Sequence, residues 1–195
     1  MKKVLIILLI LLAIAGVGYY GWQQYQAAQT KLWEEKAQLA EETLKPIKMQ
    51  FKETLMGGMQ QGVVEAIDYC NLEAPEITAK VSEGVEVGRT SHRVRNPDNE
   101  PTDLLQAPLD YYLEMERLGE KTSGQITQLP SGEWLYVEPI YTQQVCLACH
   151  GQNIAPEVQT AINEKYPNDQ ATGFKEGELR GMFWLKLAED FGAQN

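Results

Sequence analysis

Residues 146–150 read Cys-Leu-Ala-Cys-His, and this run holds two of the three cysteines and one of the two histidines in the chain. Two thiols at this spacing can each form a thioether with one vinyl group of a single porphyrin. The histidine that follows at once can reach the iron from one face. The run therefore predicts one covalently attached c-type haem, with Cys146 and Cys149 as thioether anchors and His150 as an axial iron ligand.

A Cys146–Cys149 redox disulfide and half of a zinc site are the alternative interpretations. A disulfide oxidoreductase would place the run at a helix start that follows a strand, and it would not need the histidine. A structural zinc site needs four closed ligands, and the sequence has no second Cys/His pair to supply them. Haem attachment is the interpretation that uses all three residues.

The residues leave the second axial ligand open, because cysteine, histidine and methionine are all known iron ligands. Cys70 remains after Cys146 and Cys149 carry thioethers, although a buried apolar role or an intermolecular disulfide would also suit it. His92 is the second histidine, and a structural role is its alternative. The methionines that compete for this position are Met49, Met56, Met59, Met115 and Met182.

The N-terminus indicates export to the compartment in which haem is attached to apocytochromes. Two lysines precede an apolar run without a charge, Val4–Tyr20, which would rise about 25 Å as a helix. Aromatic residues follow it, as in a membrane-interface belt, and the lysines favour a cytoplasmic N-terminus. We expect residues 1–22 to be an uncleaved inner-membrane anchor with the rest in the periplasm. A signal peptide cleaved after an A-x-A site, which would leave a soluble periplasmic protein, is the alternative.

The chain is acidic, with a net charge of −10, or −12 without Lys2 and Lys3 (15 basic against 27 acidic residues). Such a surface argues against binding nucleic acid or anionic lipid headgroups. It suits solubility and a basic partner protein. We expect a redox or signalling partner and no nucleic acid.

Residues 23–45 form a predicted helical linker, since they are polar, charged and without Gly or Pro. Apolar residues continue at three- and four-residue steps to Leu55. This stripe packs on the domain or, as the alternative, forms a homodimer seam. Pro46 should kink or restart the helix. A second helical stretch is expected from Gln60 to Asn71, with Val63, Ile67 and Cys70 on one face.

The patterns after residue 75 predict an α+β domain. Helices are expected from Pro75 to Val81, from Asp103 to Gly119 with a break at Pro108, and from Pro156 to Tyr166. Strands are expected at Val85–Arg95, Ile126–Leu129, Trp134–Tyr141 and Gly181–Leu187, the middle two as a hairpin. The haem domain is predicted to span residues 46–190, with a tail at 191–195.

Residues 45–188 resemble a family of single-haem c-type proteins with a PAS-like fold, which includes a cyanobacterial cytochrome and sensory domains of bacterial signalling proteins. The matched stretches are Ala66–Cys70, Gly88–Ser91 running into Arg95-Asn96-Pro97, the haem run with Gly151, and Tyr166-Pro167 through Asp169, Ala171 and Gly173 to Arg180-Gly181. Together they are more specific than the C-x-x-C-H run alone.

The resemblance implies a PAS-like domain in which an antiparallel sheet is flanked by helices, and an axial pair made of Cys70 and His150. His92 departs from the pattern, because similar sequences carry an apolar residue there. The resemblance also places the stretch with Arg89, Arg93 and Arg95 near the haem pocket. These arginines alternate along the expected strand, so they would share one face and could bind the haem propionates, with a solvated face as the alternative.

Two functions suit such a haem. In redox or gas sensing, a change at the iron displaces or protonates Cys70 and moves the entry helix; no kinase or cyclase follows within these residues, so the output would pass through a partner. Low-potential electron transfer by a tethered cytochrome is the alternative. Haem-dependent catalysis needs an open iron site and an acid–base group, so we do not expect an enzyme.

Overall fold

The computed structural model describes residues 2–68 and 84–192, with side chains from residue 12 onward except that of residue 13. The chain forms two compact units, residues 1–38 and 39–195. The first unit consists of the first part of helix α1, which runs from Lys2 to Gln61. In the described residues, no helix combines the length and hydropathy that a bilayer span requires. The anchor predicted at residues 1–22 stays a prediction.

The sequence predicted a kink or a restart of the helix at Pro46. Helix α1 instead continues through Pro46 as one helix. A proline removes one backbone hydrogen bond and strains the preceding turn, a cost of about 3 kcal/mol. Packing on both sides of Pro46 compensates for this cost, because Ala40 and Leu44 are fully buried and Ile47 packs against the same apolar cluster. The helix ends at Gln61, just before Gly62, whose φ is +152°. Residues 63–68 then form the described part of the second expected helix.

The second unit is built on a four-stranded antiparallel sheet in the order β1-β4-β3-β2. The strands are β1 (Val85–Thr90), β2 (Gln125–Gln128), β3 (Trp134–Tyr141) and β4 (Leu179–Leu187). The β2–β3 hairpin and the last strand confirm the sequence prediction. The first strand is shorter than predicted, since it stops at Thr90 and not at Arg95.

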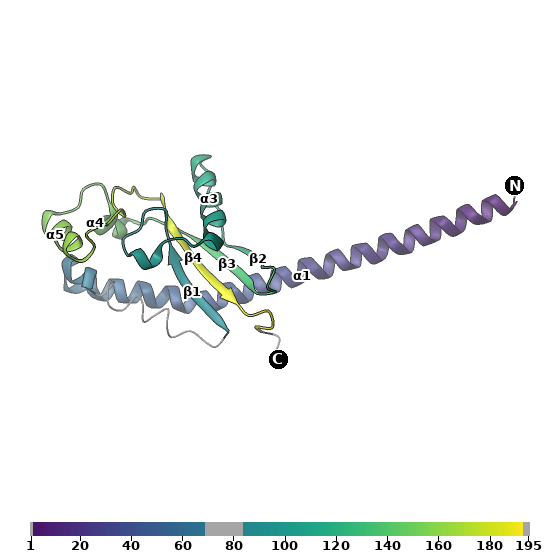
Figure 1. Cartoon of the computed structure of the whole chain (residues 1–195), viewed down its shortest axis with the longest axis horizontal. Coiled ribbons are helices and arrows are strands. Elements are labelled where there is room, and N and C mark those ends of the chain that lie inside the picture. Colours follow the sequence, from purple (N-terminus) through teal and green to yellow (C-terminus); the bar gives the residue numbers. More distant parts are fainter. Residues whose placement is uncertain (1, 69–83, 193–195) are drawn as a thin grey trace. The chain divides into compact units, whose positions relative to one another are not determined.

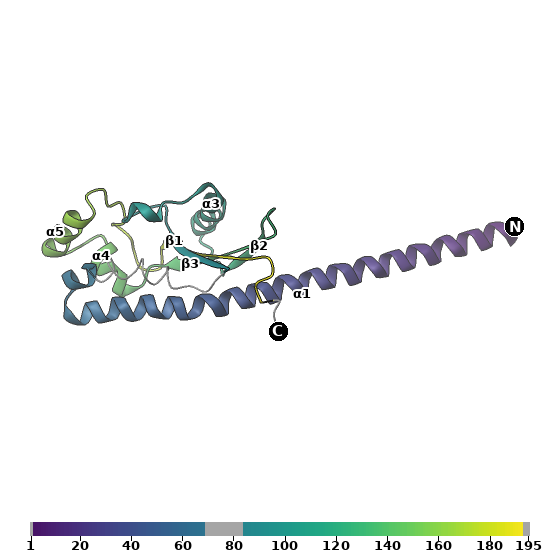
Figure 2. The ribbon, with the colours of Figure 1, turned by 60° about the horizontal axis from the view of Figure 1, so that its bottom comes forward.

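Residues 39–61 of α1 and helix α3 (Asp103–Arg117) lie on opposite faces of the sheet (Figures 1 and 2). Side chains alternate along a strand, so β3 serves both faces. Trp134 and Tyr136 pack with Leu44 of α1, and Leu135 and Val137 pack with Leu109 of α3. The predicted α+β class is confirmed. Pro108 does not break α3, because its neighbour Leu109 is buried in the core.

The short elements that carry the C-x-x-C-H run follow β3. A 3-10 turn, η2 (Gln144–Cys146), leads into the single-turn helix α4 (Leu147–His150), and α5 (Pro156–Lys165) lies close by in sequence. A third apolar cluster joins Ile67 to Val158 and Ile162 of α5, with Cys149 packed against it. Asp68 and Lys165 form an ion pair across the same contact. The segment that leads to Cys70 is thereby fixed beside the C-x-x-C-H run. Cys70 itself lies outside the described residues, as does the helix predicted from Pro75 to Val81.

Candidate cofactor site

The two cysteines of the run are half-buried thiols on successive turns of one short helical segment. Cys146 ends η2, and its sulfur accepts a hydrogen bond from the backbone N–H of Gln143 at 3.4 Å. Cys149 lies in α4 and contacts the third apolar cluster. Neither is in a disulfide.

The imidazole of His150 is held in one orientation by a backbone carbonyl. Its Nδ1 lies 2.6 Å from the carbonyl oxygen of Ala171. A carbonyl can accept a hydrogen bond but not donate one, so Nδ1 carries the proton and the lone pair is on Nε2. Burial, followed by the positive charges of Arg180 and Arg95, lowers the pKa of His150 well below its usual value. A neutral imidazole with a lone pair on Nε2 is the form that binds iron.

The backbone around His150 is fixed by pairing with a later segment. The carbonyl of His150 accepts from Phe174 N–H, and the carbonyl of Gly151 accepts from Gly173 N–H, both at 2.9 Å. Gly151 is required by a close approach, since an added Cβ would lie 2.5 Å from the carbonyl oxygen of Leu147. The glycine after the C-x-x-C-H run thus lets α4 end against residues 173–174.

Arg95 joins this segment to the C-x-x-C-H run from the other side. It donates to both carboxylate oxygens of Asp169, from Nε at 3.1 Å and from Nη2 at 3.0 Å. Nη2 also donates to the carbonyl oxygen of Cys149 at 2.6 Å. The pair is buried, with side-chain exposures of 13% for Arg95 and 4% for Asp169. Asp169 also accepts a hydrogen bond from the N–H of Ala171. One carboxylate thus positions both Arg95, which binds the carbonyl of Cys149, and Ala171, which binds the imidazole of His150.

The predicted arginines do come together near His150, but not for the reason given by the sequence. Arg89 lies in β1, where its guanidinium stacks on Phe51 at 4.1 Å. Arg93 and Arg95 lie in the loop beyond β1, so the argument that they share one strand face with Arg89 is wrong. Arg93 stacks on the ring of Phe174 at 3.4 Å and donates to Thr172.

The hydroxyl of Ser91 ends the first strand. Ser91 is buried, and its Oγ lies 2.6 Å from the carbonyl oxygen of Arg180, to which it donates. The Oγ of Ser91 also accepts hydrogen bonds from the backbone N–H of Arg93 at 3.1 Å and from Nη1 of Arg180 at 3.0 Å. Because a side chain has taken over the role of the next ladder bond, the backbone turns away from β4 at this point. The strand predicted over Val85–Arg95 is therefore too long.

Arg180 is a member of the site that sequence reasoning did not assign. It lies in β4, and its guanidinium is 5.2 Å from the ring of Phe174. The signal was available, since Arg180 stands in one of the stretches on which the family resemblance rests. Three guanidiniums, those of Arg180, Arg95 and Arg89, thus act on the imidazole of His150 in a protein whose net charge is −10.

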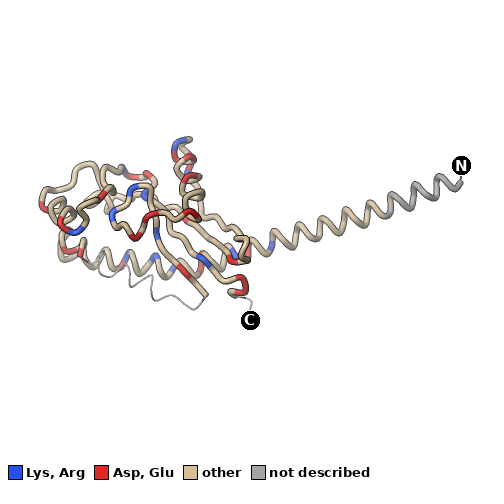
Figure 3. Tube along the Cα trace, in the orientation of Figure 1, with Lys and Arg blue, Asp and Glu red and all other residues tan. Residues whose placement is uncertain are grey.

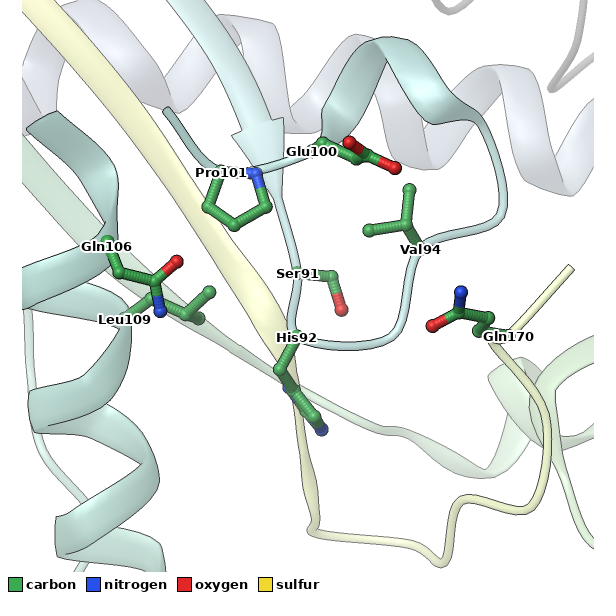
Figure 4. Close-up of a pocket in the computed structure, with 8 residues that line it drawn as sticks. All are labelled: Ser91, His92, Val94, Glu100, Pro101, Gln106, Leu109 and Gln170. Carbon is green, nitrogen blue, oxygen red and sulfur yellow. The ribbon is translucent and has the colours of Figure 1, made fainter. Parts of the chain in front are cut away.

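A cavity of about 360 Å³ lies next to this group of residues (Figure 4). Gln106 and Leu109 of α3 lie on one side of it, Gln170 on the other, and His92 at its base. The remaining lining residues are Ser91, Val94, Glu100 and Pro101. None of residues 146–150 lines it.

His92 lies between this cavity and the C-x-x-C-H run. Its ring meets the ring of Phe174 edge-on at 5.9 Å, and Phe174 meets His150 in the same way at 6.5 Å. The Nδ1 of His92 is buried and has no hydrogen-bond partner in the described part of the chain. Burial, followed by the charges of Arg93 and Arg180, lowers its pKa to about 4. His92 is thus neutral at pH 7, and Phe174 separates it from His150.

The comparison with known proteins agrees with this arrangement. The family model Tll0287-like matches residues 23–188, which is most of the chain. The chain belongs to the Tll0287-like family. The crystal structure of the cyanobacterial haem protein Tll0287 is similar to it, with 26% sequence identity and a TM-score of 0.57 over 75% of this chain and 92% of that one. No curated protein is significantly similar. The predicted resemblance to a haem-protein family is confirmed.

Proposed function

We propose that this member of the Tll0287-like family binds one covalent haem c and acts as a redox or gas sensor in the periplasm. The observation that carries the proposal is the state of His150. Its Nδ1 proton is engaged by Ala171, its Nε2 is left for a metal, and two thiols at thioether spacing precede it. The relative of known structure is itself a haem protein.

The residues present fit a haem. Cys146 and Cys149 would carry the thioethers, His150 would bind the iron, and the surrounding guanidiniums would compensate the charge of the propionates. Such a haem would supply a one-electron couple and an iron atom that small gases can bind. The protein's part is to hold the imidazole in one tautomer, exclude water with Phe174 and the third apolar cluster, and set the local charge.

Cys70 is our proposed second axial ligand, on the family resemblance. A thiolate is stabilised by ferric iron more than by ferrous iron, so reduction favours protonation of the sulfur and loss of the ligand. Residues 63–68 lead directly to Cys70 and pack on α5, beside Cys149. Loss of the ligand would therefore act on the end of this helical segment, and a signalling partner would detect the change.

Electron transfer to a redox partner is the second candidate, and the surface charge favours it. Acidic residues outnumber basic ones by 27 to 17 and are distributed along helices and loops (Figure 3). A surface of this sign attracts a basic partner and speeds encounter. We retain the inner-membrane anchor, the periplasmic location and the PAS-like description of the domain as parts of the proposal.

The test uses the full chain produced with a c-type haem attachment system. We expect haem to stay bound under denaturing conditions in the wild type and in Cys70→Ala, and to be lost in the Cys146→Ala/Cys149→Ala double variant. A protein that carries no haem in the wild type would refute the proposal. The low-spin ferric thiolate spectrum should vanish in Cys70→Ala, and an unchanged spectrum would exclude Cys70 as a ligand.

The choice between the two roles rests on ligand exchange. If the reduced protein binds CO or NO rapidly and loses its thiolate signal, the sensing role is supported. If it cycles repeatedly between ferric and ferrous forms with both axial ligands retained, electron transfer is the function.

A further inference from the structure

The guanidinium of Arg180 uses only part of its hydrogen-bonding capacity. All the hydrogen bonds that it makes with described residues come from one nitrogen, Nη1, which donates to Ser91 Oγ at 3.0 Å and to the carbonyl of Arg93 at 3.2 Å. Its Nε is buried and has no partner within residues 84–192 or 2–68. A buried donor without a partner is costly to leave in a protein interior, so such an atom indicates a missing ligand.

The edge that is left has a defined chemistry. A guanidinium presents two parallel N–H groups on its Nε–Nη2 side, and this fork matches the two oxygens of a carboxylate. The hydrogen bonds of Nη1 to Ser91 and Arg93 fix the plane of the fork. The site is thus prepared for a planar anion and not for a hydroxyl or an amide of the protein.

The protein's own carboxylates near Arg180 are already engaged by other arginines. Asp169 accepts both of its bonds from Arg95, and Glu178 lies 3.8 Å from Arg93. The structure gives Arg180 no ion pair with any described residue. Its pKa is lowered to about 10, first by burial and then by the positive charges of Arg95 and Arg89, and Asp169 opposes this shift.

We propose that the Nε–Nη2 edge of Arg180 is a carboxylate subsite that binds one propionate of the haem. This proposal rests on the function proposed above and adds a residue and a charge to it. The subsite lies beside His150, because Arg180 and His150 both contact the ring of Phe174. The propionate would complete the hydrogen bonding of Arg180, and Ser91 acts as the positioning residue of the guanidinium.

The experiment compares Arg180→Gln and Arg180→Lys with the wild type in the haem-loaded full chain. Haem content is measured first, so that failure of haem attachment in the wild type is recognised as failure of the proposed function and not of the subsite. Arg117→Gln is the control, because Arg117 is an exposed arginine on α3 that pairs with Glu114.

We expect Arg180→Gln to lower the midpoint potential of the haem. The loss of a nearby positive charge stabilises the ferric form relative to the ferrous form. The potential should also become dependent on pH, rising as pH falls, since the propionate then titrates closer to neutral. The propionate bending bands in the resonance Raman spectrum should shift. Arg180→Lys should restore the potential but not the bands, because it keeps the charge and loses the fork.

Equal potentials and bands in wild type and Arg180→Gln would overturn the proposal. Equal decreases of the midpoint potential in Arg180→Gln and Arg180→Lys would also overturn it, because they would indicate a structural role for the hydrogen bonds to Ser91 and Arg93. If Arg180→Gln does not fold, the band shift in Arg180→Lys decides, and unshifted bands there would overturn the subsite.

Discussion

The Nδ1 of His150 lies 2.6 Å from the carbonyl oxygen of Ala171, and this contact fixes which nitrogen of the ring can bind a metal. Ala171 is itself held by Asp169, through a hydrogen bond of 2.9 Å from its N–H. Asp169 also holds Arg95, which holds the carbonyl of Cys149. The backbone of Cys149 and the imidazole of His150 are therefore both positioned through one buried ion pair.

Replacing Asp169 by Asn should destabilise the protein strongly. The substitution leaves the guanidinium of Arg95 buried without its counter-charge, which typically costs about 3–5 kcal/mol of unfolding free energy. Denaturant unfolding, followed by far-UV circular dichroism, measures the loss. Glu114→Gln is the matched control, because Glu114 forms an exposed ion pair with Arg117. A similar change in both variants would contradict the role given to Asp169.

Gly151→Ala should disturb the haem run although the φ of Gly151 is −76°, which any residue can adopt. The new Cβ would lie 2.5 Å from the Leu147 carbonyl, so α4 or residues 173–174 must shift. We expect a loss of about 1–3 kcal/mol, as for overpacked interiors, and a lower yield of attached haem. Gly57→Ala is the control: nothing lies within 4 Å of its added Cβ, and the helix should gain stability. An unaffected haem yield in Gly151→Ala would refute this account of Gly151.

Ser91→Ala should reduce stability by about 1–3 kcal/mol, because the N–H of Arg93 and Nη1 of Arg180 both lose an acceptor in a buried place. Thermal and urea unfolding measure the change. Thr160→Ala removes a hydroxyl from the exposed face of α5 and serves as the control. If the two variants lose equal stability, Ser91 has no special role at the end of β1.

The stability of the protein should fall as pH drops from 6.5 to 4, and part of this fall is due to His92. Its pKa is about 4 in the folded chain, against 6.5 for an ordinary histidine. Between these values the unfolded chain binds the proton and the folded chain does not, so acid favours unfolding. Arg93 and Arg180 add to this effect and Glu178 opposes it.

The His92→Leu variant lacks this titration, so its stability should decline less steeply over the same pH window. Urea unfolding at half-unit pH steps gives the two slopes, and His150 is present in both proteins. Identical slopes would show that His92 does not titrate with a depressed pKa.

Local patterns predicted much of the fold. The strand-forming residues of Trp134–Tyr141 and the turn residues before them predicted the hairpin, and the proline at the start of α5 marked its first residue. Both prolines inside helices were misjudged, because tertiary packing of Leu44 and Leu109 outweighs a local cost that the sequence shows plainly.

The candidate site was predicted unevenly for a similar reason. Spacing alone identifies Cys146, Cys149 and His150, since their chemistry is local. Arg180 is distant in sequence and acts through contacts with Ser91 and Phe174, which only the tertiary fold brings together. The alternation of Arg93 and Arg95 suggested a strand, whereas one serine hydroxyl replaces the ladder there.

The place of β4 in the sheet has a consequence for the order of events during biosynthesis. β4 is the last strand of the chain, yet it lies between β1 and β3, so β1 has no neighbour in the sheet until residues 179–187 have been made. Gly173 and Phe174, which secure the end of α4, also follow the C-x-x-C-H run. A chain that emerges from its N-terminus therefore presents residues 146–150 before β4 is available to join β1 to β3.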